Sequence, residues 1–337
     1  MVLKISPKTW KILEAIPFSQ NAYEIAEKSG VSYNSVLWFL NNYRKNYIIS
    51  SDFNFWKIGL VPLVVLTSME NITIKIPPYT IGLCEVSGLK KMILYRALIP
   101  EKFIKKYIKD LDTDVYAVIK GKDIVRWLPN SKLTAYIKES ETIEPITSKI
   151  YEVYNELISQ KTNIDREKEK IDIIDLYIIR DKMIFSFAKL SQTLKRIHMY
   201  FSNNVTKQLL SYHYNKHVKR LWKYNYIIPL HDTLEYPLRL YYLKGKDAEV
   251  LGKLVVNLPY VFTSLIDKDK VMILAQPTPR MEYLLYDIFT MFDVKKPLGD
   301  ILISMNKYSK FFSDPSKLFI ENEWRYPDII REIKIIR

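Results

Sequence analysis

The sequence predicts an α+β protein in which one module, a helical head followed by a small sheet, occurs twice. Three observations support this: a gapless internal repeat, further echoes at nearly the same spacing, and helix-period patterns that give way to strand-period patterns. The repeat relates Ser32–Ile49 (SYNSVLWFLNNYRKNYII) to Ser211–Ile228 (SYHYNKHVKRLWKYNYII) at an offset of 179 residues. The echoes lie 180 or 181 residues apart: Pro78-Tyr79 with Pro259-Tyr260, Met92-Ile93-Leu94 with Met272-Ile273-Leu274, and Asp112 with Asp293.

The first 50 residues predict three helices and then a strand. Pro7 and Pro17 bound the first helix, Gly30 ends the second, and Ser32 caps the third, which runs to about Lys45. The side chains expected to face inward recur at helical spacing: Trp10, Leu13, Ile16, Val36, Phe39 or Leu40, and Tyr43. Helix, short helix, glycine turn, capped helix and strand is the order of a winged helix-turn-helix.

A small sheet of the ferredoxin-like kind is expected next. The pattern predicts strands over Leu63–Thr67, Tyr79–Val86, Met92–Ala97 and Val115–Lys120, a helix over Glu101–Leu111, and a loop around Ile72–Pro77 in place of the first helix. The second copy predicts a helix through Ile173 and Met183, strands over Leu238–Leu243, Tyr260–Ile266 and Val271–Gln276, and helices over Ala248–Val256 and Pro279–Phe292.

The expected fold is therefore two winged helix-turn-helix domains alternating with two ferredoxin-like α+β sheet domains. The first winged helix-turn-helix spans residues 1–52 and the first sheet domain 53–135. A helical linker at 136–170 leads to the second winged helix-turn-helix at 171–232 and the second sheet domain at 233–330.

Composition excludes several classes of protein. The 337 residues contain one cysteine, Cys84, which excludes an internal disulfide and a multi-cysteine zinc site and suits a reducing cytoplasm. Only 8 glycines occur, and no GxGxxG or GxxxxGK[ST] phosphate loop. The N-terminus lacks the pattern of a signal peptide, and no run of 18 apolar residues is present, so we expect no membrane partner and a cytoplasmic location.

The positive charge is concentrated in the second copy of the repeat. The chain carries a net charge of +14, to which an AT-rich genome or a thermophilic host can contribute without any binding function. From Ser186 to His231, however, 46 residues include eight lysines and arginines and no acid. Such a localised patch is what a polyanion-binding face requires.

Two segments resemble the Lrp/AsnC family of prokaryotic transcription regulators. Ser32–Ile49, followed by Asp52–Gly59 (DFNFWKIG), is similar to the family's recognition helix, the strand after it and the linking strand. Glu85–Gly88 entering Met92–Tyr95 is similar to the turn that opens the middle strands of its effector domain. The resemblance implies a small-molecule effector bound at Ser87 and Gly88 and oligomers formed through the sheet domains. It departs from the family at Lys90, near which the family carries an aspartate.

The candidate DNA-binding residues follow from the two repeated helices. A recognition helix places its N-terminal residues at base edges in the major groove. In the first copy the groove-facing candidates are Tyr33, Asn34, Ser35, Trp38 and Asn41, with Arg44 and Lys45 placed for phosphate. In the second copy they are Lys207, Tyr212, His213, Lys216, His217, Lys219, Arg220 and Lys223. The alternative is that the aromatic pair Tyr33 and Trp38 packs under a neighbour and that the cations are only a solvated face.

The predicted function is sequence-specific binding of double-stranded DNA by a transcription regulator that acts as an intramolecular pseudo-dimer. No catalytic residue, metal ligand or cofactor is predicted, and the chain is not expected to be an enzyme. One alternative is an architectural or replication-associated DNA-binding protein. Another is an enzyme like the sirohaem decarboxylases, which share this architecture. The four histidines lie outside the predicted sheet strands, which leaves only Arg96 for such chemistry.

Overall fold

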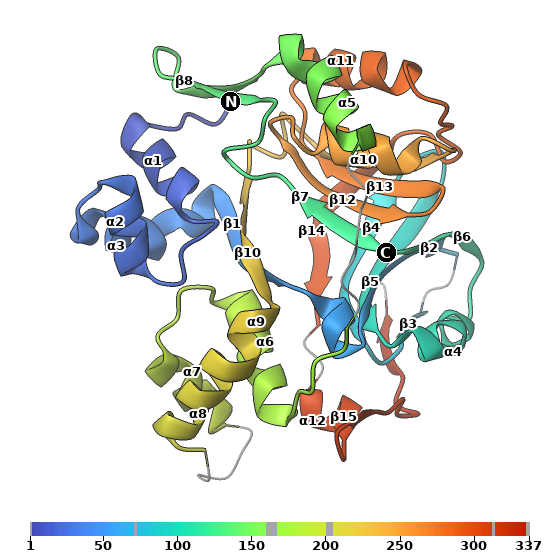
Figure 1. The fold of residues 1–337 in the computed structure, drawn as a ribbon. Helices are drawn as coiled ribbons and strands as arrows, with labels where there is room; N and C mark the ends of the chain where they lie inside the picture. Colours follow the sequence, from blue (N-terminus) through green and yellow to red (C-terminus); the bar gives the residue numbers. More distant parts are fainter. Residues whose placement is uncertain (1, 71–72, 160–166, 200–204, 312–313, 335–337) are drawn as a thin grey trace.

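Two helical heads lie beside a curled antiparallel sheet in this protein (Figure 1). The computed structural model describes residues 2–70, 73–159, 167–199, 205–311 and 314–334. The expected mixture of helices with antiparallel strands is confirmed.

The first head consists of α1 (Pro7–Ala15), α2 (Ala22–Ser29), α3 (Tyr33–Asn42), η1 (Tyr43–Lys45) and β1 (Tyr47–Phe53). The side chains of Ser6 and Asn21 cap the first two helices, and Gly30 ends α2 in the left-handed region at φ 64°. Ser32 precedes α3, but its hydroxyl lies 2.9 Å from the Ser35 hydroxyl and makes no capping bond. The predicted inward residues Trp10, Leu13, Ile16, Val36 and Phe39 are all buried.

The second head repeats this order of elements. It consists of α6 (Ile173–Ile184), α7 (Leu190–Ile197), α8 (Lys207–His213), η5 (Tyr214–Val218), α9 (Lys219–Leu221) and β10 (Trp222–Pro229). Asp172 and Asp175 form a capping box at the start of α6. The segment equivalent to α3 is here α8, η5 and α9 in succession, because η5 is a π-helical turn.

The two heads are joined through their equivalent strands. In the antiparallel ladder of β1 and β10, Ile48 lies opposite Ile228 and Ile49 lies opposite Ile227. The sequence repeat makes Ile48 the counterpart of Ile227 and Ile49 the counterpart of Ile228. A pseudo-twofold axis between the two pairs therefore exchanges one with the other, as in the isologous contact of a symmetric dimer.

The sheet is nine-stranded within the described residues and has the order β6-β2-β5-β4-β14-β11-β13-β12-β7. The first half sheet contains β2 (Val61–Ser68), β4 (Thr80–Ser87), β5 (Lys91–Ile99) and β6 (Val115–Lys120). The second contains β11 (Leu238–Lys244), β12 (Val261–Asp267), β13 (Lys270–Ala275) and β14 (Ile301–Lys310). The helices packed on these sheets are η2 (Phe55–Ile58), η3 (Glu101–Phe103), α4 (Ile104–Asp110), α10 (Ala248–Val255) and α11 (Pro279–Thr290). In both halves the neighbouring strands in the sheet follow the same order, which is the fourth, first, third and second strand of that half in the sequence.

The two half sheets exchange strands reciprocally. β6 pairs with β2 of its own copy, and β7 (Asp123–Arg126), which follows it, pairs with β12 of the other copy. In the same way β14 pairs with β11 through residues 301–303, and with β4 at residues 302–303 and again at 308–310, beyond the end of its pairing with β11. The inner face of the curl is a mixed cluster that includes Leu66 and Leu94 from the first copy and Leu240 and Met272 from the second.

The tail of each copy also packs on the other copy. Trp127, just beyond β7, is fully buried in a cluster that contains Tyr260 and Phe262. Trp324, in the C-terminal tail, lies with its ring 6.0 Å from that of Tyr79 in the first copy. The remaining elements of this tail are α12 (Pro315–Leu318), β15 (Phe319–Ile320), β16 (Glu323–Trp324) and β17 (Arg331–Lys334).

The echoed Pro-Tyr pairs share an uncommon backbone conformation. Tyr79 has φ 72° and Tyr260 has φ 63°, a region that bulky side chains rarely adopt. Both tyrosines are buried at the entry to the second strand of their half sheet. The same bend in both copies supports the internal duplication independently of the sequence match.

Two local predictions were wrong. The segment 72–77, expected to be a loop, contains β3 (Thr73–Ile76), which pairs with β17 from the C-terminal tail; Ile72 itself lies outside the described residues. The expected helical linker contains the helical elements η4 (Thr147–Lys149) and α5 (Ile150–Ser159), but β8 (Thr134–Ile137) and β9 (Thr142–Pro145) form a hairpin before them. Residues 160–166 of that linker lie outside the described residues.

Candidate nucleic-acid interface

Both heads lie on the same side of the curled sheet, at opposite ends of the β1–β10 ladder (Figure 1). Tyr47 directly follows the helices of the first head and lies opposite Pro229, where β10 ends. Trp222 directly follows those of the second head and lies opposite Phe53, where β1 ends. The antiparallel ladder therefore fixes the two heads relative to each other.

The predicted groove-facing side of α3 is exposed. Trp38 is 68% exposed and Tyr33 is 41% exposed, and Asn34 and Asn41 are exposed beside them. Ser35 is half-buried. Because Val36 and Phe39 face the core, residues on the opposite side of the helix must face solvent. Among the described residues no other element covers either ring, so the alternative that this pair packs under a neighbour is not what this part of the structure shows.

Arg44 and Lys45 are the two cations expected at the end of α3. Arg44 is exposed, and its guanidinium carbon lies 5.6 Å from the ring centre of Phe185, which follows α6 in the second head. The contact is a cation–π interaction across the two heads. The side chain of Lys45 lies outside the part of the structure that is described.

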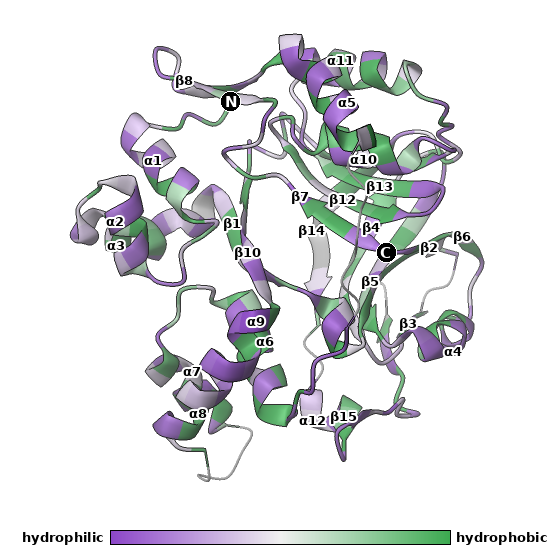
Figure 2. Cartoon of the chain, in the orientation of Figure 1, coloured by the Kyte–Doolittle hydropathy of each residue, from purple (hydrophilic) through white to green (hydrophobic). Residues whose placement is uncertain are grey.

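The second head presents a cluster of cations, which we call the basic face: Lys207, Lys216, Lys219 and Arg220. All four are exposed, and within the described residues no acidic side chain lies within 4.0 Å of them. Tyr212, 54% exposed, lies on the same helical segment. Figure 2 shows hydrophilic residues among those of α7, α8 and α9. The charge of the basic face is thus free to meet an external anion.

Two of the predicted DNA-contacting histidines turn inward. His213 is buried, and its Nδ1 lies 2.9 Å from Oδ1 of Asp175 on α6; the prediction that it faces outward was wrong. His217 is half-buried, and its Nδ1 lies 3.0 Å from Oδ2 of the same aspartate. The spacing of these histidines indicated a shared helix face, but Asp175 lies 38 residues before His213, which no local pattern could reveal.

Lys223 is not part of the basic face. It lies on β10, and its Nζ is 3.8 Å from Oδ2 of Asp52. Asp52 is buried, and Arg126 also approaches it at 3.8 Å. Burial raises the pKa of Asp52, and the two cations oppose this effect. Lys223 therefore neutralises an internal carboxylate near the ladder, which reduces what it can offer to phosphate.

A second acidic residue of this head, Asp181, is also turned inward, which keeps its charge away from the basic face. Asp181 on α6 is buried and forms an ion pair with Arg196 on α7, and Thr193 donates a hydrogen bond to it at 2.6 Å. The guanidinium of Arg196 also lies 4.4 Å from the Phe185 ring centre. Arg196, one of the eight lysines and arginines between Ser186 and His231, is therefore engaged inside the head.

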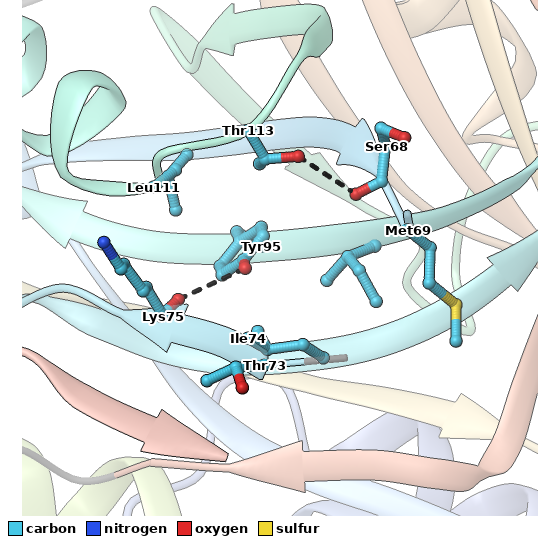
Figure 3. Close-up of a pocket in the computed structure, with 9 residues that line it drawn as sticks. Ser68, Met69, Thr73, Ile74, Lys75, Tyr95, Leu111 and Thr113 are labelled. Carbon is cyan, nitrogen blue, oxygen red and sulfur yellow. Dashed lines mark hydrogen bonds between the residues drawn. The ribbon is translucent and has the colours of Figure 1, made fainter. Parts of the chain in front are cut away.

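Ser87 and Gly88 lie where the two half sheets meet. Ser87 pairs with Leu302 of β14, and a Cβ on Gly88 would lie 2.8 Å from the Asp300 carbonyl oxygen, so the turn packs closely against the second copy. A small cavity lies elsewhere in the first half sheet (Figure 3), lined by residues that include Ser68, Lys75 and Tyr95. Its volume of about 10 Å³ matches one water molecule and not an amino acid.

Two further observations concern the enzyme alternative and membrane spans. None of the four histidines lies on a strand: His198 follows α7, His231 follows β10, and the other two lie on α8 and η5. Among the described residues, no helix combines the length and the apolar character that crossing a bilayer requires.

The chain was compared with protein-family models, with curated proteins and with solved structures. No match was found in any of the three comparisons.

Proposed function

We propose that this protein is a sequence-specific, double-stranded DNA-binding transcription regulator that acts as an intramolecular pseudo-dimer. The carrying observation is the self-reciprocal β1–β10 ladder, which holds two heads with exposed helices of unlike chemistry. A symmetric homodimer presents two equal surfaces. Here the pseudo-twofold relates an uncharged, aromatic helix face to a cationic one.

The strand orders support the finer domain assignment behind this proposal. Each half sheet places its four strands in the order fourth, first, third, second of its own copy, which is the order expected for a ferredoxin-like sheet. In each head two helices precede the exposed helix, and a strand follows it, as in a winged helix-turn-helix. We propose on these grounds a tandem, fused form of the Lrp/AsnC arrangement.

The two heads would divide the work of recognition. In the first head, Asn34 can pair with the edge of an adenine, and Tyr33 or Trp38 can contact thymine methyl groups or sugars. In the second head the basic face would bind phosphates, which fixes position without reading sequence. The protein would then bind an asymmetric site with unlike halves.

A salt titration of DNA affinity tests the electrostatic half of this proposal. The logarithm of the binding constant falls with the logarithm of salt concentration, with a slope of about −0.9 per phosphate neutralised on B-DNA. Replacing Lys216, Lys219 and Arg220 together by alanine should weaken binding to all sequences and make the slope shallower by up to about 2.7. The matched control replaces Lys102, Lys105 and Lys109, three exposed lysines beside the first half sheet. It removes the same charge and should leave the slope unchanged.

Footprinting on genomic fragments tests the sequence-specific half. Discrete protected sites are expected, and Asn34→Ala should relax the preference at one base position, at about 1–3 kcal/mol for a lost bidentate contact. A uniform coat on every fragment would favour the architectural alternative. Failure to bind duplex DNA at low salt would contradict the proposal as a whole.

A further inference from the structure

A histidine–carboxylate cluster lies beneath the basic face, inside the second head. Oδ1 of Asp175 is 2.9 Å from Nδ1 of His213 and 3.2 Å from Nδ1 of His217. The Asp175 side chain is completely buried, His213 is 8% exposed and His217 is 32% exposed. One donor atom from each residue lies within 4.8 Å of the other two.

We propose that Asp175, His213 and His217 form a binding site for a divalent transition metal ion of the Zn²⁺ class. Zinc sites are built from imidazole nitrogens and carboxylate oxygens, commonly with two histidines four residues apart on one helix face. Here the two histidines come from α8 and η5, and the carboxylate comes from α6. The ion would therefore join two elements that are far apart in the sequence.

The spacing of the donors suits a tetrahedral ion. Zinc–nitrogen bonds of about 2.0–2.1 Å place neighbouring ligands of a tetrahedron roughly 3.3 Å apart. The separations between Oδ1 of Asp175 and the two histidine nitrogens, 2.9 and 3.2 Å, need to widen by only a few tenths of an ångström, and the three ligand atoms all lie within 4.8 Å of one another. Asp172 offers a fourth ligand, because its Oδ2 lies 3.4 Å from Nδ1 of His213 while its Oδ1 caps α6.

The π-helical turn is a second feature that points to a site. η5 begins directly after His213 and contains His217, so the wide turn lies between the two ligands. Such turns are rare and occur frequently at functional sites. The equivalent helix of the first head, α3, has no such turn, and the repeat places Asn34 and Trp38 where the second copy has these histidines. The widened turn and the ligand pair thus occur together in one copy.

A bound ion would have a consequence for DNA that rests on the proposed function. Lys216 lies between the two histidines, and Lys219 and Arg220 follow them. Fixing α8 and η5 against α6 would fix the geometry of the basic face. Zn²⁺ should then raise DNA affinity.

Metal binding itself is tested on the untagged full-length protein without DNA. Co²⁺ should give the visible absorption of a tetrahedral site, saturating at one ion per chain, and Zn²⁺ should displace it. The absence of saturable Co²⁺ absorption and of stoichiometric Zn²⁺ after dialysis would overturn the proposal, and the cluster would then be a hydrogen-bonded one only.

Conservative variants separate a metal site from a structural one. His213→Asn and His217→Asn keep a hydrogen-bond donor near Asp175 but remove the imidazole, and each should weaken Co²⁺ binding by more than about 100-fold, beyond the loss typical of outer-shell changes. His198→Gln, in the same head but outside the cluster, should bind as the wild type does. Unchanged Co²⁺ binding in both cluster variants would contradict the assignment. A protein that binds Co²⁺ but not DNA would refute the proposed function and leave the metal site standing.

Discussion

Ile48 lies opposite Ile228 in the β1–β10 ladder, and the neighbouring pair, Ile49 with Ile227, is the same contact made by the other copy. Such reciprocity is the mark of an isologous interface, here formed within one chain. The strand exchange between the half sheets obeys the same symmetry, because β7 crosses to β12 as the far end of β14 crosses to β4. The molecule is therefore organised as an interlocked pair of halves.

Cutting the chain between α5 and α6 should leave the two halves of the molecule bound to each other. A specific protease site placed within residues 160–166 would cut the chain once, into an N-terminal fragment that ends there and a C-terminal fragment that begins there. Each half sheet is completed by a strand of the other copy, and Trp127 has its buried site in the second half. Light scattering after size-exclusion chromatography should therefore report one 1:1 complex of unchanged mass. Separation of the fragments in native buffer at micromolar concentration would contradict the interlocked arrangement.

Most local elements were predictable because they depend on neighbouring residues. Gly30 ends α2, and the inward stripe of Trp10 and Leu13 is buried, since turn geometry and helical periodicity act over a few residues. The strand pattern around Met92 likewise predicted β5. The ladder between β1 and β10 is a different matter, because the repeat showed that two strands exist but not that they pair with each other.

The errors have a common physical origin in long-range contacts. Residues 73–76 (TIKI) alternate polar and apolar side chains as a strand does, but the strand that pairs with them, β17, comes from the distant C-terminal tail. His213 was expected on the outer face of the second recognition helix, yet a buried carboxylate on α6 holds it inward. Lys223 similarly turns to Asp52. In each case the deciding partner is far away in the sequence, where periodicity carries no information.

Asn225 should be far more important for stability than its repeat counterpart Asn46. The buried Asn225 side chain donates to the carbonyl oxygens of Ile16 and Ser19 in the first head and accepts from the Ser51 hydroxyl at 2.7 Å. Asn225→Ala would leave these buried groups unpaired and should cost about 2–4 kcal/mol of unfolding free energy. Asn46 is exposed, so Asn46→Ala should change it by less than about 0.5 kcal/mol. Urea denaturation measures the unfolding free energy of both variants. Equal losses in the two variants would show that Asn225 does not tie the heads together.

His231 should make the protein sensitive to acid. Its Nδ1 accepts the Leu3 backbone N–H at 2.9 Å, and burial lowers the pKa of His231 to about 4. The folded state thus binds this proton less tightly than the unfolded state, whose pKa is near 6.5. Stability from this group is complete above pH 6.5 and is lost as the pH falls through 4, by up to about 3 kcal/mol. His231→Asn keeps an acceptor for Leu3 and should flatten the unfolding free energy between pH 7 and 4. An identical acid loss in both proteins would exclude His231 as its source.

Lys182 should add stability at alkaline pH. It lies buried at the end of α6, where its Nζ donates to the Ala188 carbonyl oxygen at 2.7 Å, and burial lowers its pKa to about 8. Between pH 8 and 10.5 the unfolded chain holds this proton and the folded chain does not, so the folded state gains stability as the pH rises. Lys182→Met removes the proton and the hydrogen bond together. The difference in unfolding free energy, wild type minus variant, should therefore increase by up to about 3 kcal/mol from pH 8 to 10.5, whatever its value at pH 7. Tyrosines that do not contact Lys182 contribute equally to both proteins and cancel in this difference. A difference that stays constant over that range would mean that Lys182 remains charged in the folded protein.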